Sequence, residues 1–171
     1  MISALRDFCA IDRKGGKGMQ YNNQAKEMFS KIDISGVKAD DRYPIFERTD
    51  NSGRKYYGVS HFWGMDDNIS ADTELSWLEW DGNEVNVSFS DPNQLNEKYI
   101  ESVGILKGWK EQLKKYSDSK FSIIMSYDNG DLQDEETEYS FTLRFWKERS
   151  ETEVISSIND FAQPVIIEYC N

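Results

Sequence analysis

The hydrophobic pattern of the chain is most regular between Lys120 and Lys147. Large apolar side chains occupy every second position in two runs, which are separated by an acidic stretch. Period-two alternation places the apolar members of each run on one face of a β-strand. These members are Phe121, Ile123, Met125 and Tyr127, then Tyr139, Phe141, Leu143 and Phe145. The pattern predicts a long β-hairpin whose apolar face must be covered by the rest of the chain.

A different pattern, with apolar residues three and four positions apart, begins after Asp91-Pro92. Asp favours the N-cap of a helix and Pro favours its first position. The stripe predicts a long helix, about 92–116, that covers the sheet, and Gly104 and Gly108 are candidate positions for a bend. An aromatic stripe of this kind indicates core packing rather than cofactor binding. Its members are Leu95, Tyr99, Val103, Leu106, Trp109, Leu113 and Tyr116.

Shorter helices are predicted in three other places by apolar residues at helical spacing. Ser150 and Glu153 form a capping box for the last of them, and Pro164 ends it. The three segments are 2–9, 23–31 and 154–162.

Further strands are indicated by β-branched and aromatic residues between turn residues. Pro44 makes the first of these an edge strand or one that begins late. The segments are 43–48 and 54–63, which flank the turn 49–53, then 75–80 and 84–89, and finally 165–170, which is apolar enough to lie inside the sheet.

The segments 75–80 and 84–89 are interpreted as a second hairpin, because Asp81-Gly82-Asn83 contains the Asp-Gly pair typical of tight turns. Its register stays open. A two-residue loop and a three-residue loop place opposite faces of the first strand in the core, so the loop decides which tryptophan faces outward. An exposed tryptophan beside acidic loops would suit a protein-binding surface.

Together these elements predict an α+β fold, with a mainly antiparallel sheet covered by the 92–116 helix and by shorter helices. The length of 171 residues fits a single domain, 1–171. With 38% hydrophobic and 13% aromatic residues, the chain can build a core and is not of a disordered composition. No apolar run is long enough for a membrane span, and charged residues close to Met1 exclude a signal peptide, so a cytoplasmic location is expected.

The formal net charge is −11, and it is unevenly distributed along the chain. Residues 1–60 hold 11 Lys and Arg against 8 Asp and Glu, whereas residues 61–171 hold 9 against 23. An acidic field repels nucleic acid and anionic membranes and speeds the encounter with a basic partner. Acidity also keeps small proteins in solution, so charge alone only favours the binding interpretation.

Motifs that would define a reaction are missing from the sequence. The glycine-rich stretch 13–18 is followed by Met19 rather than by the Ser or Thr of a phosphate-binding loop. His61 is the only histidine, and a structural role is favoured for it. Two reduced thiols are favoured for Cys9 and Cys170, although a disulfide between the chain ends stays open. The acidic loops at 66–74 and 128–136 do not match calcium-loop spacing, so neither a metal nor a cofactor is expected.

The loop of the central hairpin is the candidate partner-binding site. It carries six carboxylates and no Lys or Arg, and their mutual repulsion would be relieved by a cationic partner. A solvated loop without a role is the alternative. The six residues are Asp128, Asp131, Asp134, Glu135, Glu136 and Glu138.

These observations favour a non-catalytic binding protein. In general character the chain is similar to bacterial immunity proteins, which are small and acidic and inhibit a co-produced toxic nuclease, although no motif ties it to a named family. A carboxylate-rich surface can occupy a basic, phosphate-binding nuclease site. A nucleic-acid mimic acting on another basic protein is a neighbouring hypothesis. A small hydrolase, or a carbohydrate- or lipid-handling domain that uses paired carboxylates and exposed aromatics, is the alternative from another class.

Overall fold

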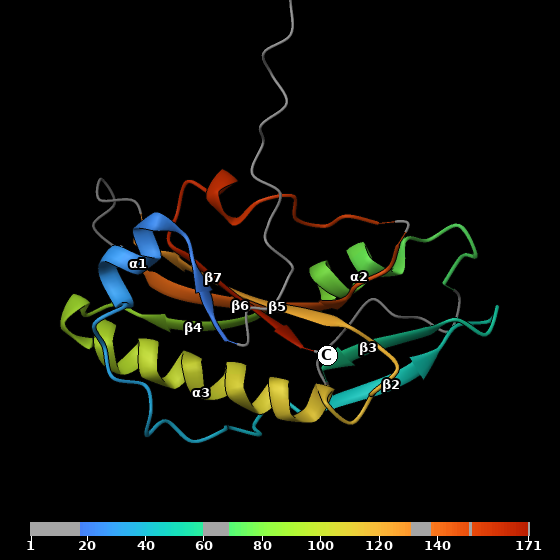
Figure 1. Cartoon of the computed structure of the whole chain (residues 1–171), viewed down its shortest axis with the longest axis horizontal. Coiled ribbons are helices and arrows are strands. Elements are labelled where there is room, and N and C mark those ends of the chain that lie inside the picture. Colours follow the sequence, from blue (N-terminus) through green and yellow to red (C-terminus); the bar gives the residue numbers. More distant parts are fainter. Residues whose placement is uncertain (1–17, 60–68, 131–137, 151, 171) are drawn as a thin grey trace, which may run out of the picture.

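The computed structural model describes residues 18–59, 69–130, 138–150 and 152–170. It is an α+β fold with antiparallel sheets (Figure 1). The strands are β1 (Gln20–Tyr21), β2 (Ile45–Thr49), β3 (Lys55–Val59), β4 (Val85–Phe89), β5 (Phe121–Asp128), β6 (Tyr139–Lys147) and β7 (Val165–Cys170). The helices are α1 (Asn23–Phe29), α2 (Leu75–Gly82) and α3 (Leu95–Leu113), with short 3-10 turns η1 (Pro92–Gln94) and η2 (Ile158–Asp160).

The main sheet has five strands in the order β1-β7-β5-β6-β4, and β2 and β3 form a separate two-stranded sheet. The predicted central hairpin is confirmed, because β5 pairs with β6 over its whole length, with Ile123 opposite Phe145 and Met125 opposite Leu143. Since paired residues share a face, the alternating apolar side chains of both strands point to the same side. The predicted interior strand is confirmed as β7, which lies between β1 and β5.

The long helix is also confirmed. It begins with η1, where Asp91 accepts a hydrogen bond from the backbone N–H of Asn93 (2.9 Å), and it continues as α3. It lies along one face of the main sheet (Figure 1). Tyr99 and Trp109 are fully buried against this face. Burial of large apolar side chains of this kind contributes roughly 1.5–3 kcal/mol each to stability.

Gly104 and Gly108 allow another part of the chain to approach the outer side of α3 closely. The segment 30–44 crosses that side (Figure 1), and the backbone N–H of Asp40 donates to the carbonyl of Gly104 (2.9 Å). A Cβ at Gly108 would lie 1.8 Å from the carbonyl oxygen of Asp40. The helix is therefore enclosed between the sheet and this segment. A glycine is required where the two backbones meet.

The opposite face of the main sheet is covered by α2 and by the chain between 152 and 164 (Figure 1). A second, smaller core lies there. Trp146 of β6 and Ile124 of β5 are buried at its centre. The sheet is thus sandwiched between two layers, although only the α3 side has a large core.

The predicted strand at 75–80 is wrong, because this segment is the helix α2. A short apolar run fits both the helical and the strand period, so only tertiary contacts decide between them. The helical period places Leu75, Ser76 and Glu79 on the buried face. Neither Asp81 nor Gly82 adopts a positive φ, so the Asp-Gly pair ends a helix instead of turning a hairpin. The strand that follows, predicted at 84–89, is confirmed as β4.

The predicted helix at 154–162 is also wrong. The segment is irregular apart from η2, and it places Ile155 and Ile158 on the second core. Ser, Asn and β-branched residues dominate it, and these are weak helix formers that favour local hydrogen bonds instead. One such bond runs from the N–H of Asn159 to the hydroxyl of Ser157 (3.2 Å).

Some of the remaining predictions are confirmed, and the others concern residues outside the described ranges. The helix predicted at 23–31 is confirmed as α1, and the strand pair around the turn at 49–53 is confirmed as β2 and β3, with β2 beginning after Pro44. The helix predicted at 2–9, His61 and Cys9 lie outside the described residues. The thiol of Cys170 is buried, and this burial raises its pKa to about 12.

Candidate functional site

Two side chains, Glu79 of α2 and Asn83 directly after it, join the separate β2–β3 sheet to the main sheet. Strand β4 pairs with β6 only up to Leu143, so no strand of the described residues pairs with the last residues of β6 on that side. Glu79 fills this position. Its Oε1 accepts from the backbone N–H of Tyr57 in β3 (2.9 Å), and its Oε2 accepts from the backbone N–H of Lys147 in β6 (2.7 Å).

Asn83, one helical turn after Glu79, continues the bridge. Its Oδ1 accepts from the backbone N–H of Val59 (3.0 Å). Its Nδ2 donates to the carbonyl oxygens of Tyr57 (2.9 Å) and Phe145 (3.2 Å). Both side chains are fully buried and meet backbone groups that would otherwise lack partners. Two side chains therefore stand in for a missing strand, and we call Glu79, Asn83 and Arg149 the α2 seam.

Arg149 neutralises the buried carboxylate of the α2 seam. Its NH1 and NH2 donate to the two oxygens of Glu79 at 2.8 and 2.9 Å. The same guanidinium also donates to the hydroxyl of Ser76 (3.0 Å) and to the carbonyls of Lys147 (3.2 Å) and Lys55 (3.0 Å). Burial raises the pKa of Glu79, and Arg149 and the two backbone N–H groups oppose that shift.

The α2 seam is a structural assembly rather than a reaction centre. Each oxygen of Glu79 already accepts one backbone N–H and one guanidinium N–H. A general acid or base needs a hydrogen-bonding direction open towards a substrate. The raised pKa of Glu79 follows from burial inside an ion pair, which structural networks produce as readily as active sites.

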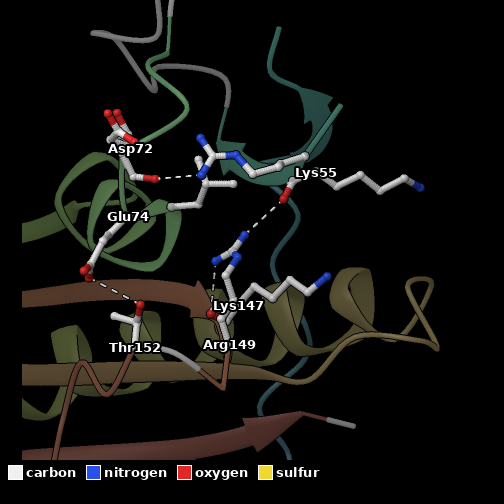
Figure 2. Close-up of a pocket in the computed structure, with 9 residues that line it drawn as sticks. Lys55, Asp72, Glu74, Lys147, Arg149 and Thr152 are labelled. Atoms are coloured by element: carbon white, nitrogen blue, oxygen red, sulfur yellow. Dashed lines mark hydrogen bonds between the residues drawn. The ribbon is translucent and has the colours of Figure 1, made fainter. Parts of the chain in front are cut away.

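A cleft of about 400 Å³ opens beside the α2 seam. Figure 2 shows the carboxylates of Asp72 and Glu74 on one side of it and the ammonium groups of Lys55 and Lys147 on the other. Glu74 accepts a hydrogen bond from the hydroxyl of Thr152 (3.3 Å). The lining residues are Arg54, Lys55, Asp72, Thr73, Glu74, Leu75, Lys147, Arg149 and Thr152.

The cations of this cleft are already engaged within the protein. The ammonium of Lys147 lies 5.7 Å from the centre of the Tyr57 ring, which is within the range of a cation–π contact. Three of the four cations that line the cleft are paired with a carboxylate, which weakens the attraction of the cleft for an anion such as phosphate. The ion pairs are Arg54 with Asp50 (2.7 Å), Lys55 with Glu47 (2.8 Å) and Arg149 with Glu79 (2.8 Å).

Asp50 stabilises the turn that positions Arg54. Its carboxylate accepts from the backbone N–H groups of Ser52 (2.9 Å) and Arg54 (2.8 Å). Burial opposes ionisation of this carboxyl, but the hydrogen bonds from Arg54 and Ser52 outweigh it and lower its pKa to about 2. The turn closes at Gly53, whose φ of 85° favours glycine.

The outer face of α2 exposes a tryptophan. Trp77 is 42% exposed, and its ring meets Trp80 edge-on, with ring centres 6.4 Å apart. Trp80 in turn packs on the buried Trp146 at 5.1 Å, and the guanidinium of Arg144 lies 5.1 Å from the centre of the Trp80 ring. The exposed indole is therefore supported from beneath by further aromatic rings, which limits its movement.

Exposed carboxylates flank this tryptophan along the chain, with Glu74 three residues before it. Asp81 lies one helical turn after it on the same exposed face of α2, and α2 itself carries no Lys or Arg. The nearest cation in the aromatic group, Arg144, is paired with Glu84. We call Trp77 together with these exposed carboxylates the α2 surface. The carboxylates are Asp72, Glu74, Asp81 and Glu153.

The two described ends of the predicted acidic loop lie away from α2. Asp128 and Glu138 are exposed at its two described ends, whereas α2 packs near the other end of β6. The structure therefore does not bring Asp128 and Glu138 together with the α2 surface. The other four predicted residues, Asp131, Asp134, Glu135 and Glu136, lie outside the described residues.

Sequence reasoning missed the α2 seam, although one signal was present. Glu79 and Asn83 are four residues apart, as two polar side chains on one face of a helix must be. Reading the segment as a strand concealed that spacing. Arg149 lies 70 residues from Glu79, so only the fold brings it there.

Comparisons with protein-family models, with curated proteins and with solved structures found no match. None of the helices in the described ranges combines the length and apolar character needed to cross a membrane. Within the same ranges, no three His, Cys, Asp or Glu side chains are grouped so that they could hold a metal ion.

Proposed function

We propose that this chain is an immunity-type binding protein that neutralises a basic toxin domain, such as a nuclease, by stoichiometric binding. The observation that carries the proposal is Trp77, a supported, exposed indole on a helix that carries carboxylates and no Lys or Arg. Tryptophan is the residue most enriched among the few that dominate binding energy, and a polar rim around it excludes water. The carboxylates steer a basic partner to this surface and fix its orientation.

The acidic loop at 128–138 has a supporting role in this proposal. Because its two described ends, Asp128 and Glu138, lie away from α2, its proposed contribution is to long-range attraction rather than to the anchor. Exposed charges act mainly on the rate of association, and each is worth about 0.5 kcal/mol.

The test uses the protein encoded by the reading frame next to that of this chain. It is purified, assayed for nuclease activity, and titrated with this chain to determine the stoichiometry and the dissociation constant. We expect 1:1 inhibition, and we expect Trp77→Ala to weaken binding by about 2 kcal/mol or more, or at least thirtyfold. Phe46→Ala is the matched control, because Phe46 is 46% exposed but lies on β2. It should change affinity less than threefold.

A further arm replaces Asp131, Asp134 and Glu135 by Asn and Gln. Slower association with a flatter salt dependence is expected. If the neighbouring protein is neither bound nor inhibited, the immunity function is refuted. If it is bound but Trp77→Ala behaves like Phe46→Ala, the α2 surface is not the anchor.

A further inference from the structure

Strand β4 is an edge of the main sheet. Its five residues pair with β6 on one side, with Val85 opposite Leu143 and Val87 opposite Phe141. On the other side, no strand of the described part of the chain pairs with it. The register runs through all five residues without interruption, so the edge is regular.

The hydrogen bonds of the α2 seam show which backbone groups of β4 face outward. Phe145 accepts from Asn83 and Lys147 donates to Glu79, so the odd-numbered residues of β6 direct their backbone groups towards the β4 side. Along an antiparallel strand, successive residues direct their backbone N–H and C=O groups to opposite sides. Two directly opposite residues therefore form either both backbone hydrogen bonds with each other or none. Val85, Val87 and Phe89 therefore bond to β6.

The N–H and C=O groups of Asn86 and Ser88 consequently point away from the sheet. Both residues are exposed. Natural edge strands are usually protected against pairing by Lys, Pro, a bulge or a covering segment. The sequence Val-Asn-Val-Ser-Phe contains neither Lys nor Pro, and the continuous register excludes a bulge. Among the described residues no strand covers it, so this edge is suited to pairing with a further strand.

Carboxylates stand at both ends of this edge. Asp81 and Glu84 precede β4, and Asp91 follows it. Because Phe89 pairs with Tyr139, Glu138 also lies at that end. Glu84 is partly neutralised by Arg144, whereas the other three are exposed. The middle of the edge is neutral and both ends are acidic.

We propose that the outer edge of β4 accepts an extended segment of a basic protein as a sixth, antiparallel strand, with Lys or Arg of that segment at the two acidic ends. The inference rests on the proposed function in taking the basic partner as the occupant. Main-chain bonds to an exposed edge supply affinity in this mode, and flanking side chains supply specificity. A second copy of the chain is a poorer occupant, because antiparallel pairing would set Asp81 and Glu84 of one copy against Asp91 and Glu138 of the other.

The experiment uses a synthetic probe and does not need the natural partner. The probe is an acetylated and amidated peptide with alternating Val and Thr at its centre and two Lys at each end. Amide hydrogen exchange and NMR titration of the full chain are followed with increasing peptide. We expect the N–H groups of Asn86 and Ser88 to be protected at least tenfold at saturation. The same peptide with Glu in place of Lys should bind at least tenfold more weakly.

Ser88→Pro removes one outward N–H without touching the ladder to β6, and proline is tolerated at such edge positions. Ser88→Thr is the control, because it keeps the N–H. The proline variant should bind the peptide at least tenfold more weakly and the threonine variant within twofold of the native chain. Unchanged exchange at Val85 and Val87 verifies that the sheet is intact.

Three results would overturn the inference: no protection of Asn86 and Ser88, equal binding by the two Ser88 variants, or protection that rises with protein concentration in the absence of peptide. The last result would assign the edge to a second copy. Because the probe is not the toxin, the two tests are independent. Absence of peptide binding would not contradict 1:1 inhibition of the toxin, and absence of inhibition would not contradict peptide binding at β4.

Discussion

Arg149→Met should destabilise the protein by about 3–5 kcal/mol, because it removes the only cation that contacts Glu79 within the described residues. Glu79 is fully buried and would keep two backbone N–H donors but no counter-charge. Removal of the guanidinium also takes a hydrogen-bond donor away from the carbonyls of Lys55 and Lys147. Domains of this kind have only about 5–15 kcal/mol of stability, so the loss would be a large fraction of the total.

The assay is urea unfolding at pH 7, followed by tryptophan fluorescence and circular dichroism. The midpoint should fall while the slope of the unfolding free energy against urea stays the same. Lys55→Met is the matched control, because the Lys55–Glu47 pair is a surface pair and should be worth at most about 1 kcal/mol. The double variant Glu79→Gln with Arg149→Met should recover part of the loss, since it leaves no buried charge. An Arg149→Met protein no less stable than Lys55→Met would refute this account of the α2 seam.

Two further predictions concern the crossing segment and the turn at Asp50. Gly108→Ala should destabilise the protein by about 1–3 kcal/mol, because the new Cβ would overlap with the carbonyl of Asp40. Gly104→Ala, whose Cβ would lie 3.3 Å from the carbonyl of Lys38, should stay within about 1 kcal/mol of the native chain because alanine favours the helix. Equal thermal unfolding of the two variants would contradict this expectation. Because the pKa of Asp50 falls from 3.8 to about 2 on folding, its ionisation stabilises the protein above about pH 4, and this contribution is lost as the pH falls towards 2. In urea unfolding, the stability difference between the native chain and Asp50→Asn should therefore shrink between about pH 4 and pH 2, and a constant difference would exclude this linkage.

Much of the fold follows from the sequence because long segments repeat their period many times. The alternation from Phe121 to Tyr127 and the spacing from Leu95 to Leu113 are each compatible with only one secondary structure that gathers these side chains on one face. Such patterns also determine the layer order, because a long helix with one apolar stripe must cover the apolar face of the hairpin.

The errors occurred where the local signal was short or ambiguous. The segment from Leu75 to Gly82 is too short to distinguish the helical period from the strand period. Its Asp-Gly pair is also compatible with the end of a helix. The role of Glu79 could not be predicted from its neighbours, because a buried carboxylate is tolerable only when Arg149 is known to reach it. The need for glycine at position 108 likewise depends on where Asp40 crosses α3.

A backbone ladder is largely indifferent to the identity of its residues, because every non-proline position offers the same donor and acceptor. The α2 seam, by contrast, depends on the identity of its side chains. Asn83 must both accept from Val59 and donate to Tyr57 and Phe145, which neither Asp nor Leu of similar size can do. The junction between the two sheets is therefore a place where single substitutions act as if a strand had been removed. In relatives of this chain, residues 79, 83 and 149 should vary together or not at all.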